Sequence, residues 1–290
     1  MTSGAEERDS AVKAGGTRRE NWKIIHRPHY GRWSVDAALV LFVVGLAWIS
    51  ITNPNFQWDV VLKYLFHPAI LSGLSVTVRL TVITMVLGVL LGIVFAMLML
   101  SRDRFLSGFA AAYIWLFRGT PLLVQLIFWF NISALYPQIS FGIPGGPYLF
   151  SFSGNAITPF MAAVLGLSLH EGAYMAEIVR GGVLAVGRGQ SLAAVALGMT
   201  PLQAFRRITL PQALRIIVPA SGNQVILMLK TTSLVSVIAL PELLYSAQTI
   251  YARTFEVVPL LIVVSLWYLL ICSLLSIVQY FLERRLGKGF

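Results

Sequence analysis

Charged residues are scarce in this chain of 290 residues: only 12% are Asp, Glu, Lys or Arg, whereas soluble domains average about 25%. Hydrophobic residues make up 57% of the sequence. This balance excludes an ordinary water-soluble domain, and the long apolar segments place the chain in a lipid bilayer.

Cysteine, metal-ligand clusters and nucleotide-binding motifs are also nearly absent. The single cysteine, Cys272, lies in an apolar segment and has no partner for an intramolecular disulfide. The four histidines are scattered, and no G-x-x-x-x-G-K-[ST] loop occurs. We therefore expect no enzyme, metal site or cofactor in this chain. If ATP drives its function, ATP and Mg²⁺ are expected to bind to another polypeptide.

Six segments are long enough to cross about 30 Å of hydrocarbon, which requires roughly 20 helical residues. They are residues 35–52, 74–100, 105–131, 159–179, 216–240 and 257–282. The fifth includes Lys230, but its other residues are mostly apolar or small. The sequence predicts an all-α integral membrane protein with six transmembrane helices.

The net charge of +10 is distributed unevenly. Most lysines and arginines precede the first segment or follow the second, fourth and sixth, which lie on one side of a six-span membrane protein. By the positive-inside rule, both termini are cytoplasmic. The basic residues therefore indicate membrane topology, and we expect contact with membrane lipid but no nucleic-acid partner.

The N-terminal region differs from the rest of the chain. Residues 1–33 are polar and carry charges of both signs, which predicts a disordered cytoplasmic tail. Residues 34–53 are expected to form a retained transmembrane helix, because no small-residue cleavage pattern follows the apolar stretch. Residues 54–70 would then connect it, outside the cytoplasm, to a domain at 71–286.

A charged insert at 189–215 separates two apolar segments. Residues 191–197 predict a short helix that Gly198 ends, and the run Thr200-Pro201-Leu202-Gln203 predicts a capped second helix. We expect Pro211 to break the backbone before the next apolar segment. The basic residues near the end of the insert are Arg206, Arg207 and Arg215.

The spacing of residues in this insert resembles the cytoplasmic EAA loop in permease subunits of ABC importers. The matching positions are Ala193, Ala194, Gly198, Ile208, Leu210 and Pro211, and the expected docking loop also includes Leu192, Met199 and Thr200. The resemblance implies two short helices that seat in a groove of the ATP-hydrolysing subunit. Leu192 stands where the family usually has Glu, so packing would have to replace an ion pair there.

Four further motifs resemble those of the polar amino acid permeases and follow one another in the family's order. They are Phe-Arg-Gly-Thr-Pro at 117–121, Gly-Ala-Tyr-Met-Ala-Glu-Ile at 172–178, Gly-Asn-Gln at 222–224 and Thr-Ser-Leu-Val-Ser-Val-Ile at 232–238. The resemblance covers about 71–286 and implies a type I importer fold with a five-helix core, to which the first helix is an addition. It also implies a bacterial inner membrane location, two ATPase subunits, a second permease subunit, and a binding protein outside the cytoplasm.

Polar residues within the apolar segments are candidates for the substrate pathway, because a charge inside a membrane costs about 2.5 to 3.5 kcal/mol on insertion scales. The candidates are Arg118, Thr120, Glu171, Asn223, Gln224, Lys230, Thr231 and Thr232. Gln224 and Thr231 are seven residues apart and share a helical face. The family often has an acidic residue where this chain has Thr231, which argues against a lysine- or arginine-like substrate.

Each candidate also has a purely structural interpretation. Glu171 would pair with a basic residue, Arg118 would brace a bend at Gly119 and Pro121, and the amides and hydroxyls would bond neighbouring helices. Gly88 and Gly92 predict close helix packing within or between subunits. The sequence leaves these alternatives open.

The sequence thus predicts a permease subunit of an ATP-driven importer for a polar amino acid or related zwitterion. It would work by alternating access, coupled to a separate ATPase through the loop at 189–215. The alternative is a membrane scaffold or signalling subunit that has the importer fold but transports nothing. A channel is disfavoured, because no filter-like sequence occurs.

Overall fold

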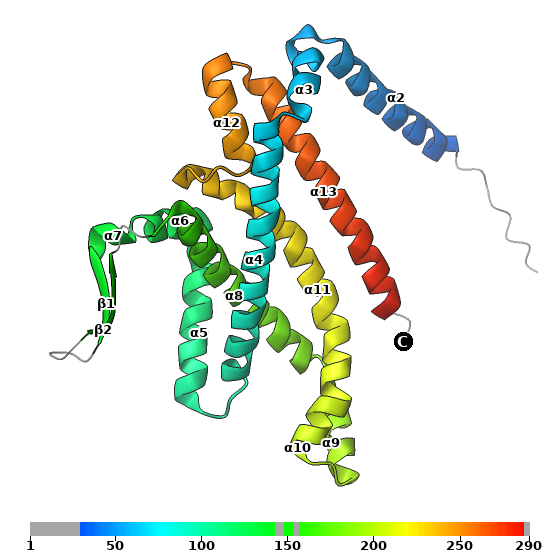
Figure 1. The fold of residues 1–290 in the computed structure, drawn as a ribbon. Helices are drawn as coiled ribbons and strands as arrows, with labels where there is room; N and C mark the ends of the chain where they lie inside the picture. Colours follow the sequence, from blue (N-terminus) through cyan, green and yellow to red (C-terminus); the bar gives the residue numbers. More distant parts are fainter. Residues whose placement is uncertain (1–29, 143–147, 154–156, 287–290) are drawn as a thin grey trace, which may run out of the picture. The chain divides into compact units, whose positions relative to one another are not determined.

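The computed structural model describes residues 30–142, 148–153 and 157–286 (Figure 1). Most of the tail predicted at 1–33 lies outside these residues. The chain divides into two compact units, Met1–Asn53 and Pro54–Phe290. The described part of the first unit consists of α2 (Tyr30–Thr52), whose apolar side chains, such as Phe42 and Trp48, are exposed.

Among the described residues, three helices are long and apolar enough to cross a membrane: α2, α4 (Pro68–Met99) and α13 (Val257–Leu286). Two bent pairs also meet this criterion. One is α5 (Arg104–Gly119) with α6 (Leu122–Phe130), and the other is the helical stretch Pro201–Ile238 with α12 (Leu243–Thr254). The remaining predicted segment, 159–179, falls on α8 (Pro159–Leu184), which is 26 residues long but more polar. The predicted helical membrane fold is confirmed, and one short β-hairpin is added to it in the described residues.

Helices α4, α5 and α8 of the second unit begin at side-chain caps. Pro68 follows His67, whose Nδ1 accepts from the N–H of Ala69 (3.3 Å). Asp103 Oδ1 accepts from the N–H of Phe105 (2.7 Å) at the start of α5. The side-chain oxygen of Thr158 caps α8 in the same way. Each cap satisfies a backbone donor that the first turn of a helix cannot pair.

The third predicted segment is not straight, because α5 and α6 meet at an angle of 100°. Thr120 is extended, as expected for a residue that precedes proline. The side chain of Gln125 donates to the carbonyls of Phe117 (3.0 Å) and Thr120 (3.1 Å) and to Thr120 Oγ1 (2.7 Å). The bend predicted from Gly119 and Pro121 is confirmed, and Gln125 satisfies backbone groups that the bend leaves free.

Helices α4 and α8 cross at the centre of the second unit (Figure 1), where they pack more extensively than any other described pair. Leu80 of α4 and Leu167 of α8 belong to one buried core, to which α6, α11 and η4 also contribute. Gly88 and Gly92 of α4 face Glu171 and Met175 of α8. The close packing predicted from the two glycines therefore occurs within the chain.

One end of the second unit is closed by elements too short to span a membrane. They are η1 (Pro54–Phe56), α3 (Trp58–Leu65) and α12. Tyr64 and Leu243 belong to a second apolar cluster that also includes Leu260 of α13. Trp267 Nε1 donates to the carbonyl of Leu65 (2.8 Å), which ties α13 to α3.

The connection between the third and fourth predicted segments, at 132–158, contains α7 (Ile132–Leu135) and a hairpin of β1 (Gln138–Gly142) and β2 (Tyr148–Ser153). The two strands are antiparallel, with Gln138 opposite Ser153. Residues 143–147 and 154–156 of this connection lie outside the described residues. In Figure 1 the hairpin begins next to α7 and lies at the left edge of the view.

The insert predicted at 189–215 lies at the opposite end of the second unit from α12 (Figure 1). It contains α9 (Arg188–Ala196), α10 (Pro201–Ala204) and the π-helix η3 (Phe205–Thr209). Then follow α11 (Leu210–Thr231) and the 3₁₀ helix η4 (Thr232–Ile238).

The prediction that Pro211 breaks the backbone is wrong, because the helical path continues from Pro201 to Ile238. Proline lacks an N–H, and its ring clashes with the carbonyl four residues earlier in an α-helix. The π-helical turn Phe205–Thr209 directly precedes this proline. Its wider i→i+5 pairing changes the backbone pattern where an α-helical turn would conflict with the ring.

Candidate functional site

The turn between α9 and α10 has the geometry that its sequence predicts. Gly198 adopts a left-handed conformation with φ of 74°, which glycine accommodates without a Cβ clash. The N–H of Met199 donates to the carbonyl of Ala194 (3.0 Å). Thr200 Oγ1 accepts from the N–H of Gln203 (3.3 Å), and Gln203 Oε1 accepts from the N–H of Thr200 (3.0 Å). This reciprocal capping box fixes the start of α10.

The outer surface of this loop is apolar. Leu192 is 69% exposed and Leu197 is 81% exposed, and Val195 and Leu202 also face outward. Ala194 is buried on the inner side of α9. Exposed leucines grouped on a structured loop indicate a surface for a protein partner. We call the surface formed by Leu192, Val195, Leu197 and Leu202 the leucine surface.

Other predicted loop residues support this surface without forming it. Ala193 is exposed, Met199, Ile208 and Leu210 are half-buried, and Pro211 lies at the start of α11. A cavity of about 560 Å³ lies beside them, on α10 and η3. Its lining residues are Thr200, Leu202, Gln203, Arg206 and Arg207. Sequence reasoning identified the two arginines as basic residues but did not predict a cavity.

Three of the predicted pathway residues meet at another cavity, of about 480 Å³. Asn223, Gln224 and Lys230 line it from α11. Ile178 of α8 and apolar residues of α11 complete the wall. The cavity therefore combines two amides and one ammonium group with apolar surface, which is the usual composition of a small-molecule site.

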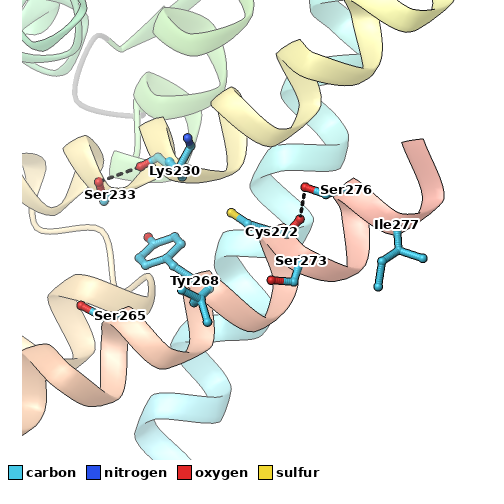
Figure 2. A pocket seen from close by; sticks show the side chains of 9 residues that line it. Lys230, Ser233, Ser265, Tyr268, Cys272, Ser273, Ser276 and Ile277 are labelled. Atoms are coloured by element: carbon cyan, nitrogen blue, oxygen red, sulfur yellow. Dashed lines mark hydrogen bonds between the residues drawn. The ribbon is translucent and has the colours of Figure 1, made fainter. Parts of the chain in front are cut away.

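Lys230 also lines a larger cavity of about 680 Å³ between α11, η4 and α13 (Figure 2). Figure 2 shows Tyr268 and a row of small polar residues of α13 on the other wall. The polar lining residues on α13 are Ser265, Tyr268, Cys272, Ser273 and Ser276. Their spacing of three, four and seven residues places them on one helical face, and this pattern in the sequence could have revealed the wall. Lys230 is thus the residue that the two cavities share.

Thr231 and Thr232 do not line either of these two cavities. Thr231 Oγ1 donates to the carbonyl of Leu227 (2.9 Å), and Thr232 Oγ1 donates to the carbonyl of Leu229 (2.6 Å). Thr232 is buried. Both hydroxyls therefore bond within their own helical segment, and a role in the pathway stays a prediction for them.

Arg118 and Thr120 lie at the bend between α5 and α6. The guanidinium of Arg118 lies 5.0 Å from the ring centre of Tyr174, a cation–π distance. Thr120 Oγ1 donates to the carbonyl of Leu116 (2.8 Å) and accepts from Gln125. In the described hydrogen bonds Gln125 braces the bend, whereas Arg118 contacts α8 through Tyr174.

Glu171 lies in the contact between α8 and α4. It is only 3% exposed, and its Oε1 has no hydrogen-bond partner among the described residues. The ion pair found among those residues joins Glu177 to Arg180 (2.7 Å), as their spacing predicts. Glu171 is not a lining residue of either cavity that contains Lys230.

A buried network that the sequence did not reveal joins three helices around Glu242. Its Oε1 accepts from the N–H of Tyr245 (2.7 Å), and its Oε2 accepts from the hydroxyls of Tyr268 (3.2 Å) and Thr77 (3.4 Å). Thr77 Oγ1 accepts in turn from the N–H of Leu243 (3.1 Å). Glu242 therefore connects the start of α12 to α4 and α13, and Tyr268 links this network to the larger cavity.

Known proteins resemble the chain over most of its length. The family described as "Binding-protein-dependent transport system inner membrane component" matches residues 88–288. The arginine transport system permease protein ArgU of Corynebacterium glutamicum is 43% identical over 264 residues, covering 90% of this chain and 82% of ArgU. The L-cystine transport system permease protein TcyB of Bacillus subtilis is 36% identical over 232 residues, covering 80% of this chain and 92% of TcyB. A crystal structure of an amino acid ABC transporter with histidines is 35% identical, with a TM-score of 0.67 over 77% of this chain and 96% of that chain.

Proposed function

Because the chain belongs to the family of inner membrane components of binding-protein-dependent transport systems, as a permease subunit of an amino acid ABC importer, we propose that it moves a polar amino acid or related zwitterion by alternating access. ATP hydrolysis in this family is performed by a separate ATPase subunit. We propose that ATP and Mg²⁺ bind there and that this chain has no ATPase activity of its own. The motion of the ATPase would reach the membrane through the loop at 189–215.

The leucine surface is the observation that carries this proposal. The turn at Gly198 and the capping box at Thr200 hold α9 and α10 in a defined geometry, and the exposed leucines lie on these helices. The helical path from Pro201 to Ile238 connects the loop directly to the cavity residues of α11. A displacement of the loop is therefore transmitted along one continuous helical segment to Lys230.

We propose that Asn223, Gln224 and Lys230 contact the substrate. The ammonium of Lys230 is suited to a substrate carboxylate. A charge inside a membrane is costly unless an opposite charge compensates it, and the carboxylate would supply that opposite charge. The cavity has no acidic residue among its described lining residues, which favours a substrate with a neutral or acidic side chain. The L-cystine in the name of TcyB has no net charge and agrees with this expectation, whereas the arginine in the name of ArgU is cationic.

The assembly and topology belong to the same proposal. The importer would be completed by two ATPase subunits, a second identical or sister permease, and a binding protein outside the cytoplasm. Both termini would be cytoplasmic, because the basic residues cluster on that side. Residues 34–53 would be an additional transmembrane helix before the importer domain at 71–286, and the connection at 132–158 would face the binding protein.

The test is ATP hydrolysis by the complex reconstituted in nanodiscs with its ATPase and binding protein. Neutral, acidic and basic amino acids, opines and ectoine are added one at a time. We expect one class to stimulate hydrolysis, and that class identifies the substrate. A rate that no compound changes, with the ATPase still bound, would contradict transport and support a scaffold.

A matched pair of variants tests the docking surface. Leu197→Asp places a charge on the leucine surface, and we expect it to prevent co-purification of the ATPase. Phe255→Asp is the control, because Phe255 is 86% exposed at the opposite end of the second unit and has a positive φ that Asp tolerates. Loss of the ATPase in both variants would indicate misfolding rather than a specific contact.

A further inference from the structure

The cytoplasmic insert has an unusual charge pattern. No Asp or Glu occurs between Glu177 and Glu242 in the sequence. The basic residues of this stretch that precede the fifth predicted segment are Arg180, Arg188, Arg206, Arg207 and Arg215. Arg180 is neutralised by its ion pair with Glu177. The insert itself therefore carries only positive side-chain charge.

Two of these arginines share the cavity of about 560 Å³ on α10 and η3. The hydroxyl of Thr200 and the amide oxygen of Gln203 are already used in the capping box, which holds this wall in place. The main polar groups left for a ligand are the guanidinium groups of Arg206 and Arg207. Neither has an ion pair or a hydrogen bond among the described residues.

The position of the cavity favours a protein ligand over a lipid. Arg206 precedes residue 216, where the fifth predicted segment begins, by ten residues, or about 15 Å of helix. The headgroup layer adds only about 5 to 8 Å to each side of the hydrocarbon. Figure 1 shows α10 at the end of the second unit, next to α9. The cavity also shares Leu202 with the leucine surface, so one partner is able to cover both.

We propose that Arg206 and Arg207 receive a carboxylate side chain of the ATPase subunit, beside the leucine surface. This inference rests on the proposed function, because it assigns chemistry to the same docking loop. A guanidinium group binds a carboxylate through two parallel hydrogen bonds, which gives both charge and directional complementarity. The acidic partner residue lies on the rim of the groove that receives α9 and α10. Apolar contact holds the two proteins together, while the arginines accelerate their encounter and select the partner.

The experiment measures association of the purified cognate ATPase with the full chain in nanodiscs at several salt concentrations. For R206Q/R207Q we expect an association rate about tenfold lower at low salt, with a weaker dependence on salt, because the steering charges are gone. R102Q/R104Q removes the same charge from two exposed positions, one in the connection between α4 and α5 and one at the first residue of α5. This control is expected to keep at least half of the wild-type rate.

Each other result has a defined meaning. An unchanged rate and salt dependence for R206Q/R207Q would overturn the inference, and so would an equal loss in R102Q/R104Q, since net charge alone would then explain the effect. If the slower association of R206Q/R207Q disappeared in nanodiscs without anionic lipid, the arginines would be binding lipid, and this result would also overturn the inference. Failure of the proposed function is distinct: the wild-type chain would not bind the ATPase, or Leu197→Asp would bind it normally.

Discussion

Gly88 of α4 lies so close to Glu171 of α8 that a Cβ atom at position 88 would come within 2.7 Å of Glu171 Cγ. One turn further, Gly92 meets the backbone of Met175 and Ala176 in the same way. The two glycines are four residues apart on α4, and the residues they face are four residues apart on α8. The backbones of the two helices therefore lie close together over one turn at the centre of the second unit. A side chain at either glycine would have to separate the helices.

The first prediction concerns this contact. Gly88→Ala is expected to destabilise the protein by about 1 to 3 kcal/mol, because it overpacks a site whose neighbours are buried. The control is Gly108→Ala on α5, where a Cβ would meet nothing within 4 Å. That change is expected to be neutral or slightly stabilising. Thermal unfolding in nanodiscs distinguishes them, and equal midpoints would show that α4 and α8 separate easily.

The second prediction concerns Glu242. Tyr268→Phe removes one hydrogen bond and is expected to cost about 1 kcal/mol. Glu242→Ala leaves the buried donors of Tyr245, Tyr268 and Thr77 without their acceptor and is expected to cost about 3 kcal/mol or more. Combined, the two changes should cost less than the sum of their separate effects, since they break the same bond. Thermal unfolding of the three variants and of exposed Asp59→Ala measures this, and strict additivity would argue against the network.

How far the sequence predicts this structure depends on the range of the interactions involved. The turn at Gly198 and the cap at Thr200 follow from neighbouring residues, so they are predicted correctly. The apolar segments follow from hydrophobicity over about 20 residues. By contrast, Glu242 meets Thr77 across 165 positions of sequence, and no local pattern reveals that contact. The helices α3 and α12 were missed because they are too short to read as spans.

The predicted site shows the same division. Asn223, Gln224 and Lys230 line one cavity because they lie on the same helix, whereas Thr231, which the seven-residue spacing paired with Gln224, does not line it. The opposite wall of the larger cavity, with Ser265 and Tyr268, comes from α13 and depends on tertiary packing. The expected break at Pro211 failed for a different reason. The rule that proline interrupts a helix applies to α-helical pairing, and here a π-helical turn precedes the proline.

The third prediction concerns the turn of the docking loop. Gly198→Ala forces a Cβ into a left-handed conformation, at a cost of about 1 to 2 kcal/mol. Since a Cβ there meets nothing within 4 Å, the penalty is purely conformational, and Gly198→Asn should be tolerated better. We expect up to about tenfold weaker ATPase binding for the alanine variant. Gly189→Ala in α9 is the control, and titration of the ATPase onto nanodiscs measures all three. Normal binding by Gly198→Ala would mean that the loop does not need this turn.

The fourth prediction concerns Lys230, which the two cavities share. Lys230→Met keeps an unbranched side chain but removes the charge, so a substrate carboxylate loses its partner. We expect the substrate concentration for half-maximal stimulation of ATP hydrolysis to rise at least tenfold, which corresponds to about 1.4 kcal/mol of binding energy.

Two further variants separate a substrate contact from a structural role of Lys230. Lys230→Arg keeps the positive charge and should retain much of the affinity. Ser273→Ala changes only the larger cavity, because Ser273 does not line the smaller one. If its effect matched that of Lys230→Met, the substrate would bind against α13 rather than beside Asn223 and Gln224. If Lys230→Met responded to substrate as the wild type does, the ammonium would be extending toward the membrane surface, as lysines near helix ends do, and not contacting substrate.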